Sequence, residues 1–480
     1  MRVTVLFLCL SVLLLSACAT NPATGRNQFT GLMPPGQEAS IGASEHQKVL
    51  EQFGLVQDQT LQAYVTQVGR NIVPYTERGD VTYKFFVLDS DTVNAFALPG
   101  GYVYVTRGLL SLANSEAELA AVMAHEIGHV TGRHSAERYS RGVVTAIGAA
   151  VLGASIDNPN VTKALNTGTD LYLRSYSRSQ ESEADQLGVR YLYRAGYDPF
   201  AMSRFLQSLQ QETALQSQIS GRSNPPAFLS THPDTGDRSA VSAQIAGTYE
   251  FNPKAVVRRD DYLRQINGLT YGNAHKEGFT QGQTFFHPKI GFKFTAPRGF
   301  DIINQSDVVI AKATDGTAMI FDFDSNQQAF DPQSYLQGSW MNNEQIGPVE
   351  RVMIGNMRAA MAQFPAMVKG RAFNIRLVAI EWQPHVYARF QIAMPQGLSS
   401  GQISSLREAL FSFSRMTDAE KGAIKLEKIA IVTARPGDTV SSLAARQPFE
   451  KMNEARFRVL NALAPNEGLQ AGRLYKIVVR

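Results

Sequence analysis

The clearest chemical signal in the chain is the run His125-Glu126-Ile127-Gly128-His129. At about 100° per residue in a helix, His125 and His129 lie one turn apart and within about 40° of each other. Both imidazoles can therefore bind one metal ion, and this spacing is typical of zinc peptidases. Glu126 lies beside the pair, where its carboxylate can take a proton from a water molecule next to the metal. We predict a catalytic zinc site with one ion per chain.

The residues around this motif favour a buried site over two solvated histidines on a helix surface. The predicted helix begins at a capping box formed by Ser115 and Glu118 and extends to about residue 138. Its remaining residues are largely apolar, among them Leu119, Val122, Met123, Ile127 and Val130. Burying two imidazoles and a carboxylate without partners would cost several kcal/mol, and a bound zinc ion removes that cost.

Two histidines leave a catalytic zinc ion one protein ligand short of the usual three. The downstream segment 177–185 is rich in carboxylates and precedes or begins a predicted helix over about 180–195. Glu183 lies two residues from both Glu181 and Asp185, about 160° around the helix from each, so it points the opposite way. His134 follows His129 by about 140° of helical rotation and is expected to face away from the metal.

The His-Glu-x-x-His motif and the later Glu-x-x-Ala-Asp motif together resemble the HtpX/CAAX-prenyl-protease family of gluzincin metallopeptidases. The outer-membrane lipoprotein branch of that family is the most similar in organisation, and the resemblance covers roughly residues 21–283. It implies that Glu181 is the third zinc ligand, with Glu183 as the competing candidate. It also implies that Asp185 orients a ligating imidazole through its second ring nitrogen.

The family's His-Pro…Arg element matches Thr231-His232-Pro233-Asp234 followed by Arg238. The resemblance implies that His232 lies near the metal and that Arg238 pairs with nearby carboxylates. Two functional roles for His232 stay open: it caps the open metal position, or it stabilises the oxyanion of the reaction. We favour the oxyanion role, and a loop histidine that only caps a helix is the structural alternative.

The segment 94–101 matches the edge strand that precedes the metal helix in this family. A peptide substrate would pair with Asn94, Ala95, Phe96 and Ala97 through main-chain hydrogen bonds. Alternating apolar residues predict another strand over Val81–Leu88. Membrane relatives carry spanning helices between the two metal motifs, whereas the apolar stretch 142–156 of this chain is too short to span a bilayer. We expect that stretch to form a lid over the cleft or to contact lipid.

The N-terminus has the pattern of a secretory signal. Met1-Arg2 is followed by a mostly apolar run and then by Leu15-Ser16-Ala17-Cys18. This end resembles a bacterial lipobox, which implies cleavage after residue 17 and lipidation of Cys18. Ala19, in place of an aspartate, implies the outer membrane as destination, and two or more acyl chains would give stable anchoring. A short buried N-terminal helix is the alternative.

The composition excludes several other classes of protein. The 480 residues are 44% hydrophobic and 18% charged, which is typical of globular domains rather than of disordered or multi-span membrane chains. Lys and Arg outnumber Asp and Glu by only 46 to 42, without a dense basic tract, so we expect no nucleic-acid partner. The two cysteines, Cys9 and Cys18, lie at the start, which excludes a disulfide framework and a cysteine-ligated metal site.

We predict an α+β protein with three bodies after a signal peptide at 1–17. Residues 18–270 form a mainly helical zincin metallopeptidase domain with a small edge sheet. Residues 284–416 form an antiparallel α+β domain, with strands expected at 292–295, 308–313, 318–323, 374–382 and 386–392 and a helix at 403–413. The Gly291–Phe300 pattern of this domain resembles the PsbP-type fold. Residues 429–480 read strand, helix, helix, strand and resemble a LysM module, a glycan-binding fold, or else form a capping subdomain without ligand.

These expectations combine into one functional hypothesis. The chain is predicted to be a zinc metalloendopeptidase in the bacterial periplasm, lipid-anchored to the outer membrane, whose substrates are unfolded or misassembled envelope proteins. One alternative is a latent chaperone or scaffold for envelope proteins that rarely cleaves. Another is a cell-wall anchor that contacts peptidoglycan through residues 429–480 and retains little proteolysis.

Overall fold

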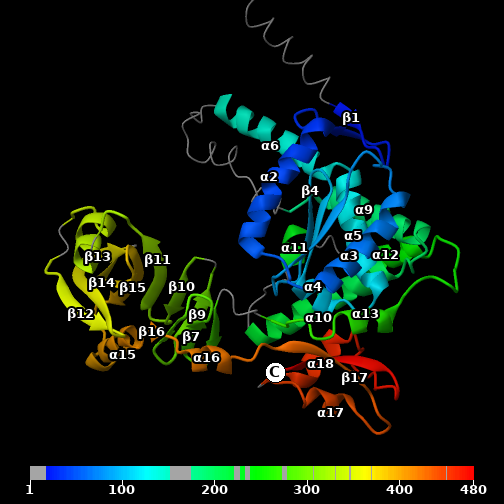
Figure 1. Cartoon of the computed structure of the whole chain (residues 1–480). Coiled ribbons are helices and arrows are strands. Elements are labelled where there is room, and N and C mark those ends of the chain that lie inside the picture. The colour runs from blue at the N-terminus through cyan, green and yellow to red at the C-terminus, as the bar shows by residue number, and fades with distance from the viewer. Residues whose placement is uncertain are drawn as a thin grey trace, which may run out of the picture. The chain divides into compact units, whose positions relative to one another are not determined.

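The computed structural model describes residues 18–151, 175–220, 227–232, 238–272, 278–305, 307–329, 331–344, 347–368, 370–449 and 451–480. They belong to two compact units: Met1–Gly272 together with Glu427–Arg480, and Asn273–Leu426 (Figure 1). The first is mainly helical and the second is rich in strands, so the mixed α+β class is confirmed. The predicted signal peptide, residues 152–156 of the predicted lid, Pro233 and Asp234 lie outside the described residues.

The central helix of the first unit is α5 (Glu116–Thr131), and all of its 16 residues are buried. A helix buried on every side must be apolar around most of its circumference, which is what the sequence of α5 provides. Ser115 caps its N-terminus by accepting the N–H of Glu118 at 3.2 Å. The predicted capping box is wrong in its second contact, because the Glu118 carboxylate accepts the N–H of Asn114 at 2.8 Å.

The predicted single helix to about residue 138 is in fact two helices. α5 ends at Thr131 and α6 (His134–Val151) begins after a break at Arg133, whose φ of 54° lies in the left-handed region. The Arg133 guanidinium fixes this break by donating to Glu38 at 2.8 Å and to the carbonyl oxygen of Met33 at 2.6 Å. Helical phase is therefore lost between the metal motif and His134.

A three-stranded sheet lies beside α5, in the order β3 (Lys84–Leu88), β5 (Tyr102–Thr106), β4 (Ala95–Leu98). β3 is parallel to β5 and β4 is antiparallel to it. The strand predicted from Val81 starts three residues later, because the N–H of Val81 instead donates to Arg78 in a turn. Gly100 and Gly101 have φ of 76° and 87° and make the tight turn from β4 to β5 that the sequence predicts. β4 is thus an edge strand of this sheet.

The other helices of the first unit surround α5 and the sheet. α9 begins with a capping box in which Ser177 and Gln180 satisfy each other's backbone groups. The bounds are α2 (Pro35–Phe53), α3 (Gln59–Ile72), α4 (Arg107–Leu112), α9 (Arg178–Arg194), α10 (Ala201–Ser220), α11 (Ala227–Thr231), α12 (Arg238–Ala246) and α13 (Arg259–Gln265). A short 3-10 turn covers Val73–Tyr75, and the hairpin β1 (Cys18–Thr20) and β2 (Asn27–Phe29) opens the described chain.

The C-terminal residues have the predicted order of strand, helix, helix, strand: β17 (Lys428–Thr433), α17 (Val440–Ala444), α18 (Asn453–Leu460) and β18 (Leu474–Val479). They belong to the first unit. The N–H of Tyr271 donates to the carbonyl of Glu427 at 2.7 Å, so the chain on either side of the second unit is paired. The buried Lys476 ammonium donates to the carbonyls of Ser111, Leu112 and Ala113 at 2.7, 3.1 and 2.8 Å. The second unit is therefore an insertion into the first.

The second unit contains a seven-stranded antiparallel sheet in the order β12-β13-β14-β15-β11-β10-β9 and a four-stranded sheet in the order β16-β8-β7-β6. The strands are β6 (Phe279–Gln281), β7 (Thr284–His287), β8 (Phe292–Thr295), β9 (Asp301–Asn304), β10 (Val309–Lys312), β11 (Ala318–Ser325), β12 (Glu350–Ile354), β13 (Met357–Val368), β14 (Arg371–Gln383), β15 (Val386–Pro395) and β16 (Ser414–Arg415). Its helical segments are α14 (Pro332–Ser334), the π-helical turn Tyr335–Trp340, α15 (Ser400–Phe411) and α16 (Asp418–Ala423).

The predicted strands of the second unit correspond to β8, β10, β11, β14 and β15, and the predicted helix to α15. Buried aromatic rings fill the core between these elements, with Phe292 lying 4.8 Å from Phe321 and 5.7 Å from Phe413 between ring centroids. β6, β7, β9, β12, β13 and β16 were not predicted. No helix within the described ranges is long and apolar enough to cross a membrane.

Candidate metal centre

Three elements of the first unit bring four potential metal ligands together. His125 and His129 come from α5, Glu181 from the first turn of α9, and His232 from the residue after α11. One ligand atom from each lies within 4.8 Å of the others, and all four side chains are buried. The geometry therefore unites the residues that the two sequence motifs predicted with the histidine of the later element.

The donor atoms have the spacing that a zinc ion needs. His125 Nε2 and His129 Nε2 are 3.1 Å apart, and Glu181 Oε1 is 3.4 Å from His129 Nε2. Ligands at about 2.0–2.1 Å in a tetrahedral site are separated by about 3.3 Å. Two imidazole nitrogens and a carboxylate form a donor set that suits a catalytic zinc ion. The residues present therefore fit the metal.

Asp185, one turn after Glu181 on α9, lies behind His125. Its Oδ1 is 2.9 Å from His125 Nδ1, the nitrogen that does not face the ligand cluster. Arg238, the first residue of α12, holds this carboxylate with two contacts at 2.7 and 2.8 Å and lies 3.1 Å from Glu181. Asp185 and Arg238 thus have the contacts that the sequence predicted for them.

The positions of His134 and Glu183 test the predictions made from helical phase. Glu183 points away from the metal ligands, as predicted. His134 is not among the clustered metal ligands, as predicted, but its Nδ1 lies 2.8 Å from His129 Nδ1, a contact behind the ligand that helical phase did not predict because the break at Arg133 redirects the chain. The opposite nitrogen, His134 Nε2, is 3.6 Å from Glu183 Oε2.

Glu126 has the properties of a general base. Both of its carboxylate oxygens are buried, and neither forms a hydrogen bond within the described part of the chain. Burial raises its pKa above the usual range for a glutamate. A carboxylate that forms no hydrogen bond and has a raised pKa is suited to accept and return a proton.

The ligand carboxylate is held in the ionised state by its surroundings. Burial alone would raise the pKa of Glu181, but His232 and His129 hold it well below its usual value. Burial lowers the pKa of His129, which favours the neutral ring that a metal ligand must have. Burial would also raise the pKa of Asp185, and Arg238 with His125 outweighs that effect.

His232 contacts two of the other potential ligands and also Glu126. Its Nδ1 is 3.2 Å from His125 Nε2 and 3.1 Å from Glu181 Oε1, while its Nε2 is 3.4 Å from Glu126 Oε1. The Nδ1 atom of His232 therefore has the spacing of a fourth metal ligand. Phe228 stacks on the ring of His232 with centroids 4.5 Å apart, so the ring is fixed by packing as well.

The segment that carries His232 also covers the predicted substrate strand. Asn94 precedes β4, which contains Ala95, Phe96 and Ala97, and all four residues are buried. The N–H of Phe228 donates to the carbonyl of Val93 at 3.1 Å. β4 is an edge strand, as expected, but residues 227–232 lie against the chain at its start.

One residue that touches the centre was not predicted. Tyr176 is buried and stacks on His129, with centroids 3.8 Å apart and ring planes at 16°. Its N–H donates to the carbonyl of Thr231 at 3.2 Å, which ties it to the segment that carries His232. An aromatic residue just before the helix cap Ser177 was the only available signal, and such a residue is common without a metal.

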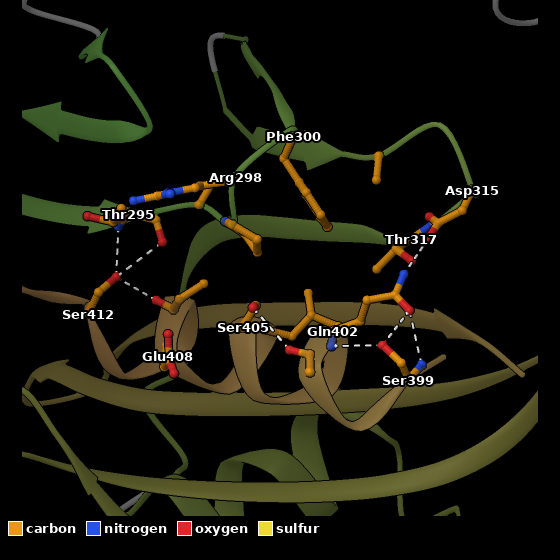
Figure 2. Close-up of a pocket in the computed structure, with 16 residues that line it drawn as sticks. Thr295, Arg298, Phe300, Asp315, Thr317, Ser399, Gln402, Ser405, Glu408 and Ser412 are labelled. Carbon is orange, nitrogen blue, oxygen red and sulfur yellow. Dashed lines mark hydrogen bonds between the residues drawn. The ribbon is translucent and has the colours of Figure 1, made fainter. Parts of the chain in front are cut away.

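A separate groove of about 880 Å³ lies in the second unit, between α15 and the loops that follow β8 and β10 (Figure 2). Figure 2 shows Ser399, the N-cap residue of α15, and Gln402 and Ser405 of α15 facing Phe300 and Thr317. The lining residues include no histidine or cysteine, so the groove provides neither a metal-binding set nor a thiol nucleophile. We assign it no reaction.

Comparison with known proteins agrees with the geometry of the first unit. Residues 59–244 match the model of Peptidase family M48. In this segment the chain is similar to that family. The matched segment contains the His-Glu-x-x-His motif, Glu181, His232 and Arg238, which include the four clustered potential metal ligands.

Two relatives show how far along the chain this similarity extends. The chain is 32% identical to the beta-barrel assembly-enhancing protease of Escherichia coli (strain K12) over 257 residues, 51% of each protein. It is 30% identical to the mitochondrial metalloendopeptidase OMA1 of Schizosaccharomyces pombe over 228 residues, 46% of this chain and 63% of the relative. The chain spans about half the length of the first of these relatives.

One comparison with a solved structure concerns the PsbP-type resemblance. A cyanobacterial PsbP from Synechocystis covers 28% of this chain and 91% of its own, with 9% identity and a TM-score of 0.23. A score this low does not establish a shared fold. The PsbP-type and LysM-type resemblances therefore stay predictions.

Proposed function

We propose that the chain is a zinc endopeptidase of the bacterial periplasm, anchored to the outer membrane through a lipid on Cys18, and that it cleaves unfolded or misassembled envelope proteins. The observation that carries the proposal is the buried set of His125, His129 and Glu181 beside the Glu126 carboxylate, whose oxygens form no hydrogen bond within the described residues. Such a set is costly to bury without a metal ion, and it provides both the ligands and the base that peptide hydrolysis needs.

Glu126 performs the proton transfers in this proposal. Zinc bound by His125, His129 and Glu181 would polarise the scissile carbonyl and lower the pKa of water at the site to about 7. Glu126 accepts the proton of the attacking water and returns it to the nitrogen of the leaving amine. Burial raises the pKa of Glu126, which supports the second of these steps because it favours the protonated carboxyl that returns the proton.

His232 holds the enzyme latent in this account. Its Nδ1 has the spacing of a fourth ligand, and its distances to His125 and Glu181 support the capping role over the oxyanion role that we favoured from the sequence. The same segment lies against the start of β4 through Phe228. A substrate that pairs with β4 would displace residues 227–232 and with them the capping imidazole. The displacement that admits the substrate would then also remove the cap and activate the enzyme.

The substrate class and location rest on the relatives and on the N-terminal pattern. One relative is named for enhancing β-barrel assembly, and the lipobox-like run ending at Cys18 supports an anchor on the same membrane as such barrels. A Cys18→Ser variant should lack the lipid and leave the membrane fraction, or retain its signal peptide. An unchanged mass and unchanged fractionation would exclude the anchor.

The covered site also favours a second candidate, a latent chaperone that binds envelope proteins and rarely cleaves. Incubation with an outer-membrane β-barrel protein kept unfolded separates the two functions. The endopeptidase should give fragments that disappear with a chelator and return with added zinc, and the same barrel folded in detergent should resist. Suppressed aggregation without fragments would favour the chaperone and contradict our proposal.

A further inference from the structure

The two histidines of α5 are supported in different ways. Asp185 lies directly against His125 Nδ1, at 2.9 Å. Behind His129 there is a second imidazole, His134, and only then a carboxylate, Glu183. Histidines that bind metals almost always donate their other N–H to a fixed acceptor, which sets the tautomer and the ring orientation. The question is whether His134 and Glu183 serve His129 in that way.

The proton positions on these rings follow from metal binding, given the proposed function. His129 must present an unprotonated Nε2 to the metal, so its Nδ1 carries the hydrogen. That N–H donates to His134 Nδ1 at 2.8 Å, which makes His134 Nδ1 the acceptor. The hydrogen of His134 is then on Nε2, the nitrogen that faces Glu183 Oε2 at 3.6 Å. Every hydrogen in the chain of three groups points from the metal side toward the carboxylate.

Glu183 is fixed by the first residues after the predicted lipidation site. Thr24 Oγ1 donates to it at 2.9 Å, Arg26 Nε lies 3.1 Å away, and Asn21 Nδ2 also donates to it. Asn21 further donates to the carbonyl of Gly132 at 3.3 Å, at the end of the metal helix. Residues 18–29, which form the β1–β2 hairpin, therefore hold Glu183 as Arg238 holds Asp185.

The backbone beside His134 is shaped to admit its ring. A side chain at Gly132 would place its Cβ 2.5 Å from His134 Nε2 and 3.0 Å from Cδ2. Gly132 has φ of −71° and ψ of −7°, a conformation that alanine adopts without strain. The ring of His134 is the nearest group to such a Cβ, and the carbonyl oxygen of Gly128 is next at 3.1 Å.

We propose that His134 and Glu183 are positioning residues that orient the metal ligand His129, and that the N-terminal hairpin 18–29 holds this relay in place. If Cys18 is lipidated, the anchored end of the chain is part of the metal site's support. The proposal rests on the metal assignment of the proposed function. It adds that loosening the hairpin or the relay weakens metal binding without removing a ligand.

The test uses the full-length protein and measures the zinc dissociation constant by competition with a chelator. Glu183→Gln removes the charge, His134→Leu removes the acceptor, and Gly132→Ala displaces the ring without removing a polar group. Each should weaken zinc binding by about 10–100-fold, the usual loss for such supporting groups. His134→Asn, whose amide oxygen can accept the His129 N–H, should restore part of the loss.

A matched control comes from another carboxylate that binds α9. Glu77 accepts from Arg190 at 2.9 Å and from Arg194 at 3.1 Å. Glu77→Gln should leave zinc affinity unchanged. The visible spectrum of the cobalt(II)-substituted protein gives a second readout, because it responds to ligand orientation and not to stability. It should shift in the three relay variants and not in Glu77→Gln.

The outcomes separate this proposal from the proposed function. Wild-type zinc affinity and cobalt spectrum in Glu183→Gln and Gly132→Ala, with metal loss in Glu181→Ala, would overturn the relay and leave the proposed function standing. Metal retention in Glu181→Ala would contradict the proposed function and the relay that rests on it. If His134→Leu does not fold, the other two variants decide the result.

Discussion

The two units of the molecule bury opposite kinds of side chain. The interior of the first unit contains imidazoles, carboxylates and arginines, including His125, Glu126, Glu181 and Arg238. Among the described residues of the second unit, Thr317 is the only buried polar residue apart from tyrosines, and the main core is apolar with six phenylalanines. Buried charge is expensive unless it is paired or binds a metal. The difference therefore locates the chemistry in the first unit without reference to any relative.

The largest effect should come from removing the carboxylate ligand. Glu181→Ala should abolish stoichiometric zinc binding, because it deletes one of three ligands and leaves Arg238 without one of its two buried partners. Loss of one member of a buried charged set costs about 3–5 kcal/mol, so the first unit should also unfold earlier. Metal analysis and denaturant unfolding measure the two effects. Glu381→Ala, which removes an ion pair with the exposed Arg358 in the second unit, should change neither.

A core mutation in the second unit should show the opposite pattern. Phe292 is 1% exposed and packs among other rings, so Phe292→Ala should destabilise the second unit by about 3–5 kcal/mol. Zinc affinity should stay at the wild-type value, since no metal ligand comes from this unit. Ile290→Ala also shortens a large hydrophobic side chain, but at a position that is 42% exposed, and is therefore the control. A fall in zinc affinity with Phe292→Ala would contradict the division of roles.

Removing the capping imidazole should raise activity. His232→Ala deletes a contact to the Glu181 carboxylate, and hydrogen bonds to charged groups are worth about 1.5–3 kcal/mol. Cleavage of a short peptide should therefore increase by about 10–100-fold at unchanged zinc content. His385→Ala, in the second unit, should have no effect. A decrease of about 10²–10³-fold would support the oxyanion role instead.

A smaller effect should test whether the C-terminal element is part of the first unit. Lys476→Met leaves the carbonyls of Ser111, Leu112 and Ala113 without their donor, and one unsatisfied buried group costs about 1–3 kcal/mol. The first unit should lose about that much stability, and the second should keep its own. Lys48→Met, at an exposed ion pair with Glu45, should change little. Equal stability of Lys476→Met and wild type would favour an independent C-terminal module.

The sequence predicted the metal ligands better than their support. The spacing of His125 and His129 has a direct geometric meaning, whereas Glu181 was implied only by the family resemblance. The contact of His134 with His129 was missed because the helical rule assumes one continuous helix, and the left-handed Arg133 ends it. Tyr176 contacts the centre only through tertiary packing, which no local pattern reports.

Strand prediction in the second unit was limited in the same way, because local patterns do not report tertiary contacts. β8 and β11 have alternating or aromatic sequences and were predicted, whereas β13 (Met357–Val368) is rich in alanine and methionine and was not. Those residues favour helices in isolation. Pairing with β12 and β14 on both sides makes this segment a strand, because strand preference depends on neighbours more than helix preference does.

The most direct test of the account compares the wild-type protein with Glu126→Gln at matched zinc content. Glu126 is the one acidic group of the centre that the account uses as a base and not as a ligand. We expect one zinc ion per chain in both proteins and a loss of peptide cleavage by about 10²–10⁴-fold in the variant. Cleavage at the wild-type rate by zinc-loaded Glu126→Gln would contradict the assignment of this centre as the site of hydrolysis.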